Sequence, residues 1–230
     1  MLASPVICVD GPSGAGKGTL CRQLAQVLDW HLLDSGALYR AVGVACQRAD
    51  IELGVASEVA AIAAVLEVDF RATEEGVAIW LAEEDVTTDI RSETGGLGAS
   101  QVALHPEVRE VLLAKQRAWA RAPGLVADGR DMGTVVFPDA PLKIFLTASA
   151  EARAERRFHQ LQGMGQDVSL PRLLVDIQER DARDSSRKSS PLMPAGDAIL
   201  IDSTVLTAEE VVMKVRRLAS SRGIVSGTTD

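Results

Sequence analysis

Short apolar runs alternate with longer amphipathic segments along most of the chain. The runs are bounded by polar or glycine-containing sequence, as is typical of buried strands, and cover residues 5–10, 30–34, 125–128, 142–147 and 198–202. Apolar residues recur at helical spacing between them, and helices are expected at 106–121 and 149–162. Strands that alternate with helices predict an α/β fold, with a doubly wound, five-stranded parallel sheet flanked by helices.

Residues 66–87 follow a different pattern. Apolar positions alternate or cluster at 66–72 and 77–81, on either side of the polar turn TEEG, and a short third run follows at 85–87. This pattern predicts a small antiparallel β meander inserted into the α/β core. The last residues, 221–230, are rich in serine, glycine and threonine, and a frayed tail is expected there.

Composition limits the class of protein. With 230 residues, the chain suffices for one α/β core with an insertion, but not for two full-sized domains. The net charge of −8 disfavours nonspecific nucleic-acid binding. The three cysteines have the spacing of neither a zinc site nor a disulfide framework. Because no targeting segment is present and no apolar run reaches the roughly 18 residues that span a membrane, we expect a cytoplasmic protein without membrane contact.

A glycine-rich turn with a lysine follows the first strand. Residues 11–19 read GPSGAGKGT, and Leu20 and Leu24 then continue at helical spacing. Backbone N–H groups of such a loop can wrap a phosphate chain, Lys17 adds a positive charge, and the N-terminus of the helix faces the anion. The pattern therefore predicts a P-loop, and the alternative is a fortuitous glycine-rich turn. In nucleoside monophosphate kinases, GKGT is the usual form of this motif.

Arginines gather on two predicted helix faces. Arg153, Arg156 and Arg157 share one face by their spacing, and Arg180, Arg183 and Arg187 share another. Phosphoryl transfer requires charge neutralisation, and guanidinium groups bind phosphate through paired hydrogen bonds, so a lid that clamps phosphates is one interpretation. The other is a pair of solvated helices with ordinary surface ion pairs. The P-loop favours the lid.

Three further motifs resemble those of the bacterial cytidylate kinase family. They are LLDSGALYR at 32–40, ADGRDMGTVVFPDA at 127–140 and ERDARDSSRKSSPLMPAGDAILIDST at 179–204. Together with the P-loop they indicate a resemblance that extends over nearly the whole chain, including the meander insertion, and DGRDMGT is the most specific of the motifs. The resemblance implies direct in-line transfer of the γ-phosphoryl group of ATP to CMP or dCMP, with Mg²⁺ as cofactor, ATP and CMP or dCMP as the bound partners, and a closing arginine lid.

The resemblance also implies roles for individual residues. The ATP-binding loop would be Gly11, Pro12, Ser13, Gly14, Ala15, Gly16, Lys17, Gly18 and Thr19. The acceptor phosphate would be bound by Arg40 and Arg130, helped by Ser13 and Ser35. Cytosine would be read by Ser100, Arg109 and Asp131, and the sugar would be held by Arg180 and Asp184. The catalytic groups would be Lys17, Asp128 and the lid arginines Arg157, Arg183 and Arg187. Magnesium would be held by Thr19 and Asp128, through water.

Alternatives stay open for several of these residues. Arg109 could lie along a surface helix, Ser100 could begin a helix, Asp131 could cap a turn and Asp184 could be a plain surface carboxylate. The glycines at 95, 96 and 98 depart from the family pattern and should loosen the segment that carries Ser100.

The chain as a whole has rival interpretations too. One is a P-loop kinase for UMP, AMP or a metabolite such as shikimate, and another is a P-loop switch protein with slow hydrolysis. We expect a single monomeric domain, with a core at 1–40, 106–150 and 190–220, an inserted monophosphate-binding region at about 41–105 and a lid at about 151–189.

Overall fold

The computed structural model describes residues 4–73, 76–163, 165–187 and 189–225. The chain separates into two compact units, one made of residues 1–33 and 120–230 and the other of residues 34–119. We call them unit 1 and unit 2. Unit 2 includes residues 106–119, which we had expected in the core. The second half of the expected tail, residues 226–230, lies outside the described residues.

Unit 1 is built on the expected five-stranded sheet. Its strands lie in the order β2-β6-β1-β7-β8, with β1 parallel to β6 and β7, and β7 parallel to β8. The strands are β1 (Val6–Asp10), β2 (His31–Asp34), β6 (Leu125–Gly129), β7 (Leu142–Thr147) and β8 (Ile199–Asp202). All five expected strands are confirmed to within a residue at each end. The central strands β1 and β6 are buried along their whole length.

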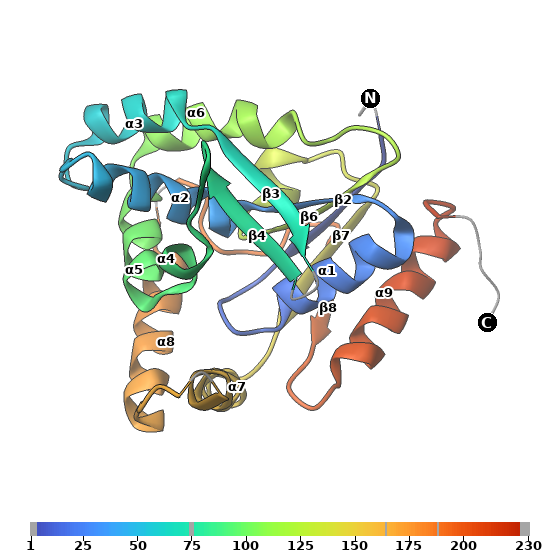
Figure 1. Cartoon of the computed structure of the whole chain (residues 1–230). Helices are drawn as coiled ribbons and strands as arrows, with labels where there is room; N and C mark the ends of the chain where they lie inside the picture. The colour runs from blue at the N-terminus through green and yellow to red at the C-terminus, as the bar shows by residue number, and fades with distance from the viewer. Residues whose placement is uncertain (1–3, 74–75, 164, 188, 226–230) are drawn as a thin grey trace. The chain divides into compact units, whose positions relative to one another are not determined.

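Helices α1 (Lys17–Leu28) and α9 (Ala208–Ser221) lie side by side, as Figure 1 shows, and share one apolar cluster with the sheet. Leu20 and Leu24 are buried there as expected, whereas Val27 points outward and is 51% exposed. Helices α7 (Ala150–Gly163) and α8 (Leu170–Ser185) pack against each other in the same unit. Since α8 ends at Ser185, Arg187 lies beyond the helix on which we had placed it.

Unit 2 combines helices with a three-stranded antiparallel sheet. The sheet has the order β3-β4-β5, from β3 (Val68–Thr73), β4 (Gly76–Leu81) and β5 (Glu84–Asp85), so the expected meander is confirmed. The helices are α2 (Ser35–Arg48), α3 (Ala56–Val65), α4 (Thr87–Arg91), α5 (Glu93–Val102) and α6 (Pro106–Arg117). Helix α6 is shorter than expected, because the Trp119 amide bonds to the Gln116 carbonyl in a tighter turn.

Two buried clusters hold unit 2 together. One joins α2, α3, α5 and α6, and the other joins α2 and α4 to the small sheet. Hydrophobic packing of this kind keeps α2 and α5 in fixed positions within the unit, and these are the helices that carry Arg40 and Ser100. Among the described residues, no helix has the length and apolar character needed to cross a bilayer.

Candidate active site

The glycine-rich loop leaves β1 in a conformation that only glycine adopts easily. Gly11 and Gly16 have φ angles of 144° and 93°, and Gly16 precedes the first residue of α1. A Cβ at Gly11 would lie 1.9 Å from the carbonyl oxygen of Leu146 on the adjacent strand β7. The loop is therefore pressed against the sheet, with the N-terminus of α1 directly behind it, as a phosphate-binding loop requires.

Lys17 is held at the carboxyl edge of the sheet. Its Nζ donates to the Pro12 carbonyl oxygen at 3.0 Å and lies 3.7 Å from Oδ1 of Asp128 at the end of β6. The side chain is only 6% exposed. A buried ammonium group beside a carboxylate and a loop carbonyl is positioned to neutralise phosphate oxygens that enter the loop.

The residues around Asp128 fit a hydrated magnesium ion. Oδ2 of Asp128 lies 3.7 Å from where a Cβ of Gly18 would stand, so the carboxylate reaches the first turn of α1, where Thr19 carries its hydroxyl. Among the described residues, no group of three or more histidine, cysteine or acidic side chains could hold a metal ion. A pair of oxygen donors suits Mg²⁺, which keeps several waters and takes phosphate ligands.

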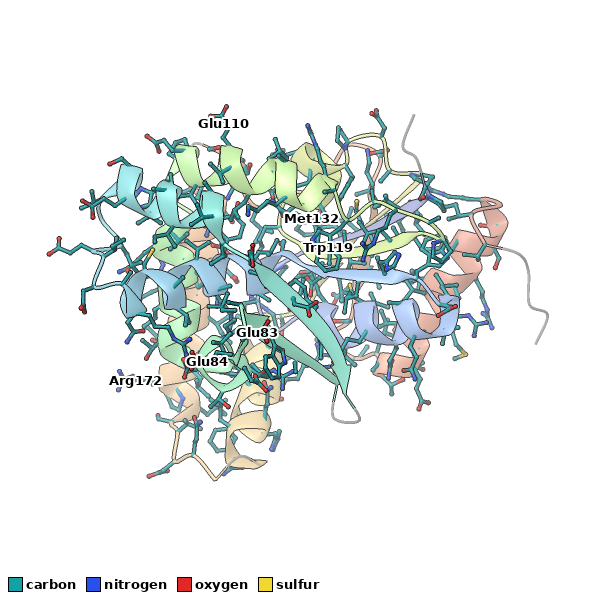
Figure 2. The ribbon with its side chains drawn as sticks, turned by 45° about the horizontal axis from the view of Figure 1, so that its top comes forward. Glu83, Glu84, Glu110, Trp119, Met132 and Arg172 are labelled. Carbon is teal, nitrogen blue, oxygen red and sulfur yellow. The ribbon has the colours of Figure 1, made fainter. Side chains whose placement is uncertain are left out.

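A buried carboxylate at the end of β1 organises the turn after β6. Asp10 is 4% exposed, and its two oxygens accept the backbone N–H groups of Met132 and Gly133, each at 2.8 Å. Burial raises the pKa of Asp10 to about 6, although the two amide hydrogen bonds oppose that rise. Met132, labelled in Figure 2, is fully buried as well. This turn carries Arg130 and Asp131.

Asp184 is the centre of an arginine cluster. It is 2% exposed, so the alternative of a plain surface carboxylate is wrong. Its Oδ2 accepts from Nε of Arg130 at 3.1 Å, and its Oδ1 accepts from Arg187. Burial alone would raise the pKa of Asp184, but the charges of Arg130, Arg187 and Arg180 more than offset it and hold the pKa below 3.8. Predicted phosphate-binding and sugar-binding residues thus meet at one carboxylate.

The arginines of α7 differ from one another in their contacts. Arg153 is buried, and it donates to the Ser13 carbonyl oxygen in the P-loop and to both oxygens of Asp181 on α8. Arg156 donates to the backbone carbonyl of Ser203. The guanidinium groups of Arg153 and Arg156 therefore join α7 to other parts of unit 1. Arg157 donates to its neighbour Gln160, and Arg183 on α8 is exposed.

In unit 2, two predicted acceptor-binding residues lie on α2. Ser35 is the first residue of the helix and is buried. Arg40, on the same helix, donates to the Ile90 carbonyl oxygen at 2.6 Å. The helix is capped by Asp34, which accepts the Ala37 amide, so its N-terminus is fixed at the end of β2.

The predicted base-reading residues of unit 2 lie on α5 and α6. Ser100 lies inside α5 and donates to the Gly96 carbonyl oxygen, so the alternative that it begins a helix is wrong. Arg109 lies over the ring of Tyr39, 5.6 Å from its centroid, a contact that the sequence did not reveal. This stacking holds the guanidinium against α2.

The glycines before Ser100 have a packing role. A Cβ at Gly95 would lie 2.6 Å from the Asp89 carbonyl oxygen, and a Cβ at Gly43 on α2 would lie 3.5 Å from the backbone of Gly98. The missing side chains allow α5 to approach α4 and α2 closely. The departure from the family pattern is therefore built into the packing of unit 2.

The matching family model and the similar curated proteins belong to one family. The family model described as cytidylate kinase matches residues 7–221. The chain is 53% identical to a cytidylate kinase from Aeromonas hydrophila, with 95% of each chain covered, and 57% identical to one from Edwardsiella ictaluri, with 90% of this chain and 92% of the relative covered. It is also similar to a solved shikimate kinase from Acinetobacter baumannii, at 17% identity and a TM-score of 0.44, with 96% of this chain and 95% of that chain covered.

Proposed function

The chain belongs to the cytidylate kinase family, and from that premise we propose that it transfers the γ-phosphoryl group of ATP to CMP or dCMP. The products are ADP and CDP or dCDP. The observation that carries the proposal is the end of β6 and the turn that follows it. Asp128, near the end of β6, lies 3.7 Å from the P-loop lysine, and Arg130 and Asp131 follow on a turn fixed by buried hydrogen bonds.

The P-loop and Lys17 bind the phosphates of ATP in this proposal. The backbone amides of residues 11–19 and the N-terminus of α1 supply donors, and the ammonium group of Lys17 is drawn from the Pro12 carbonyl to the outer phosphates. Magnesium, when bound, neutralises phosphate charge, and Thr19 and Asp128 would hold it through water. A phosphate acceptor is already ionised at neutral pH, so no general base is needed.

Arginines bind and orient the acceptor. We assign Arg40 and Arg130, with Ser13 and Ser35, to its phosphate, and Arg180 and Asp184 to its sugar. The planar guanidinium group matches phosphate oxygens in pairs, which fixes the direction of attack as well as neutralising charge. Arg157, Arg183 and Arg187 would approach the transferred group when the lid, residues 151–189, closes and excludes water.

Selectivity for cytosine follows from Ser100, Arg109 and Asp131. A carboxylate accepts a hydrogen bond from the amino group at C4 of cytosine. Uracil has an oxygen at the same position, which is also an acceptor and cannot donate to the carboxylate. Mispaired polar groups in a buried site cost far more than lost apolar contact. Asp131 is 6% exposed, so the discrimination takes place away from solvent.

Replacement of Asp131 tests this selectivity. In Asp131→Asn, one carboxylate oxygen is replaced by an NH₂ group, which would face the amino group of cytosine. For that reason kcat/KM for CMP should fall by about 100-fold. The loss for UMP should be smaller, so the CMP to UMP ratio narrows. Equal losses for the two acceptors would remove Asp131 from base recognition.

We further propose a cytoplasmic monomer in which residues 1–40, 106–150 and 190–220 form the core and residues 41–105 the inserted acceptor-binding region. The sequence supports this division through the alternation of strands and helices outside the insertion. This division by function differs from the division by packing, in which residues 34–40 and 106–119 belong to unit 2. The net charge of −8 also disfavours nonspecific binding of nucleic acid.

The test of the function is ADP formation by the pure protein from ATP and Mg²⁺, with CMP, dCMP, UMP, AMP, shikimate or no acceptor. We expect strong turnover with CMP and dCMP alone. Lys17→Met should lower that turnover by about 1,000-fold or more, which ties it to the P-loop. Turnover without an acceptor, or with none of the acceptors, would instead support a P-loop switch protein.

A further inference from the structure

The carboxylate of Asp10 lies outside every role assigned above, yet it makes two buried contacts with the turn that carries Arg130 and Asp131. We propose that Asp10 is a positioning residue for the acceptor: it caps the turn of residues 132–136 from a neighbouring strand, and so releases Asp131 from capping and fixes it for base recognition. This inference rests on the proposed function, because it deepens the assignment of Asp131.

The geometry of the cap is the first argument. Residues Met132–Val136 form a single helical turn of the π type, and the first amides of a helical turn have no partner within it. Asp10 supplies a partner for two of them, since Oδ1 accepts the Met132 N–H and Oδ2 accepts the Gly133 N–H, both at 2.8 Å. Each carboxylate oxygen serves one amide, and both contacts are buried.

The position of Asp131 is the second argument. Aspartate immediately before a helical turn ordinarily caps that turn with its own side chain. Here Asp131 occupies that position, but its side chain makes no capping hydrogen bond, while its backbone carbonyl accepts the amides of Val135 and Val136 at 2.9 and 3.1 Å. Because Asp10 has taken over the amides, the Asp131 carboxylate takes no part in the cap.

The surroundings of Gly133 are the third argument. A Cβ at Gly133 would lie 3.1 Å from Cδ of Lys143 and 3.4 Å from Oδ2 of Asp10. Lys143 is itself held, because its Nζ donates to both oxygens of Asp197 at 2.9 Å and to the Pro138 carbonyl oxygen at 2.5 Å. The turn therefore packs at Gly133 against both the Asp10 carboxylate and the stem of a lysine that is itself held in place, and it has little room to shift there.

Replacement of Asp10 by asparagine should disturb this arrangement without changing its volume. An amide offers one acceptor oxygen and one NH₂ group, so one of the two backbone donors would face another donor. The turn can then recover a cap from Asp131, its local aspartate, and the base-reading carboxylate is drawn out of place. The damage should fall on the acceptor and not on ATP.

The experiment compares Asp10→Asn with the wild type, with Asp131→Asn and with the double variant. In Asp10→Asn we expect KM for CMP to rise by about ten-fold or more while KM for ATP stays within about two-fold. Since both substitutions act on one turn, the double variant should lose no more than about three-fold beyond Asp131→Asn alone. A rise of both KM values together, or losses that multiply, would overturn the proposal.

Two further variants separate positioning from folding. Val211→Ala removes buried volume from α9, far along the chain from the turn, and should lower stability without the CMP-selective rise in KM. Gly133→Ala crowds the turn from the Lys143 side and should repeat the CMP-selective rise in milder form, even if Asp10→Asn fails to fold. A Gly133→Ala enzyme with wild-type KM for CMP would contradict the inference.

Activity of the wild type separates failure of the proposed function from failure of the Asp10 proposal. If it does not phosphorylate CMP at all, the proposed function fails. If it does, and Asp10→Asn retains the wild-type KM for CMP, the function stands and the positioning role of Asp10 is wrong.

Discussion

The turn after β6 and the C-terminal end of α8 are each organised by one buried carboxylate, and the two carboxylates have different kinds of partner. Asp10 is 4% exposed and accepts only neutral backbone amides in the turn. Asp184 is 2% exposed and accepts from the guanidinium groups of Arg130 and Arg187. Burial raises the pKa of Asp10 to about 6, whereas arginine charges hold the pKa of Asp184 below 3.8.

The difference indicates two uses of a buried acid. Backbone amides cannot leave the turn, so Asp10 is a permanent part of the scaffold, and the cost of its burial is only partly offset. The arginines around Asp184 are long side chains to which the proposed function assigns phosphate binding, and in that proposal their contacts with the carboxylate are exchanged for contacts with a substrate. On this account, one carboxylate fixes a turn, and the other holds arginine side chains in place for the anionic substrate of the proposed reaction.

The largest effect is expected at Asp184. Asp184→Ala leaves three neighbouring arginines without their shared counter-charge, and should destabilise the fold by about 3 kcal/mol or more. It should also lower turnover and weaken CMP binding, while ATP affinity changes little. Urea unfolding and calorimetric titration with each nucleotide measure these effects.

Asp176→Ala is the matched control, because Asp176 is exposed on the same helix. It should leave stability and CMP binding nearly unchanged. A large loss of ATP affinity in Asp184→Ala would argue against an acceptor role for the cluster, and wild-type stability would argue against its structural role.

The two carboxylates should also affect the pH dependence of stability with opposite signs. Between pH 3.8 and about 6, folded Asp10 keeps a proton that the unfolded chain has lost, so its contribution to stability falls as pH rises through that window. Asp184 has a lowered pKa, so its contribution is complete above pH 3.8 and is lost as pH falls through its folded pKa.

The Asp10 contribution can be isolated by difference. The free energy of unfolding of the wild type, minus that of Asp10→Asn, should decrease by about 2 kcal/mol from about pH 4 to about pH 7, as expected for a rise of about two pKa units. Urea unfolding of both proteins across this range measures it. If this difference in the free energy of unfolding is independent of pH, or increases with pH, the raised pKa of Asp10 is contradicted.

The smallest effect is expected for an exposed ion pair. Arg48 donates to both oxygens of Glu84, labelled in Figure 2, at 2.7 and 2.9 Å, and the two side chains are 37% and 67% exposed. Because solvent already stabilises both charges, Glu84→Gln should cost less than about 1 kcal/mol. Urea unfolding at low and high salt tests this. If Glu84→Gln lowered the free energy of unfolding as much as Asp184→Ala does, burial would not explain the difference between the two sites.

The sheet and the P-loop could be predicted because they depend on local sequence. Each of the five strands is a short apolar run with a clear boundary. The glycines of residues 11–16, followed by Lys17, form a pattern that is specific to phosphate-binding loops. The small meander was predictable for the same reason. The exposure of Val27 was not, since helical spacing alone cannot tell where an apolar face meets the sheet.

The finer organisation of the site depends on contacts between residues far apart in the chain. Asp10 meets a turn more than a hundred residues later, and Arg153 joins the P-loop carbonyl of Ser13 to Asp181. Neither pairing has a periodic signature in the sequence. The packing role of Gly95 was missed because helix propensity suggests a weak helix, whereas the close approach to α4 requires a residue without a side chain.

The most direct test of the contrast between the two carboxylates is a carboxyl-carbon NMR titration of the native protein, with Asp10→Asn and Asp184→Asn to assign the two signals. We expect the Asp10 signal to titrate with a midpoint of about 6 and the Asp184 signal to remain ionised until below pH 3.8. If both signals titrate near 3.8, or if Asp184 takes up its proton at the higher pH, the distinction between a fixed scaffold acid and an exchangeable counter-ion is wrong.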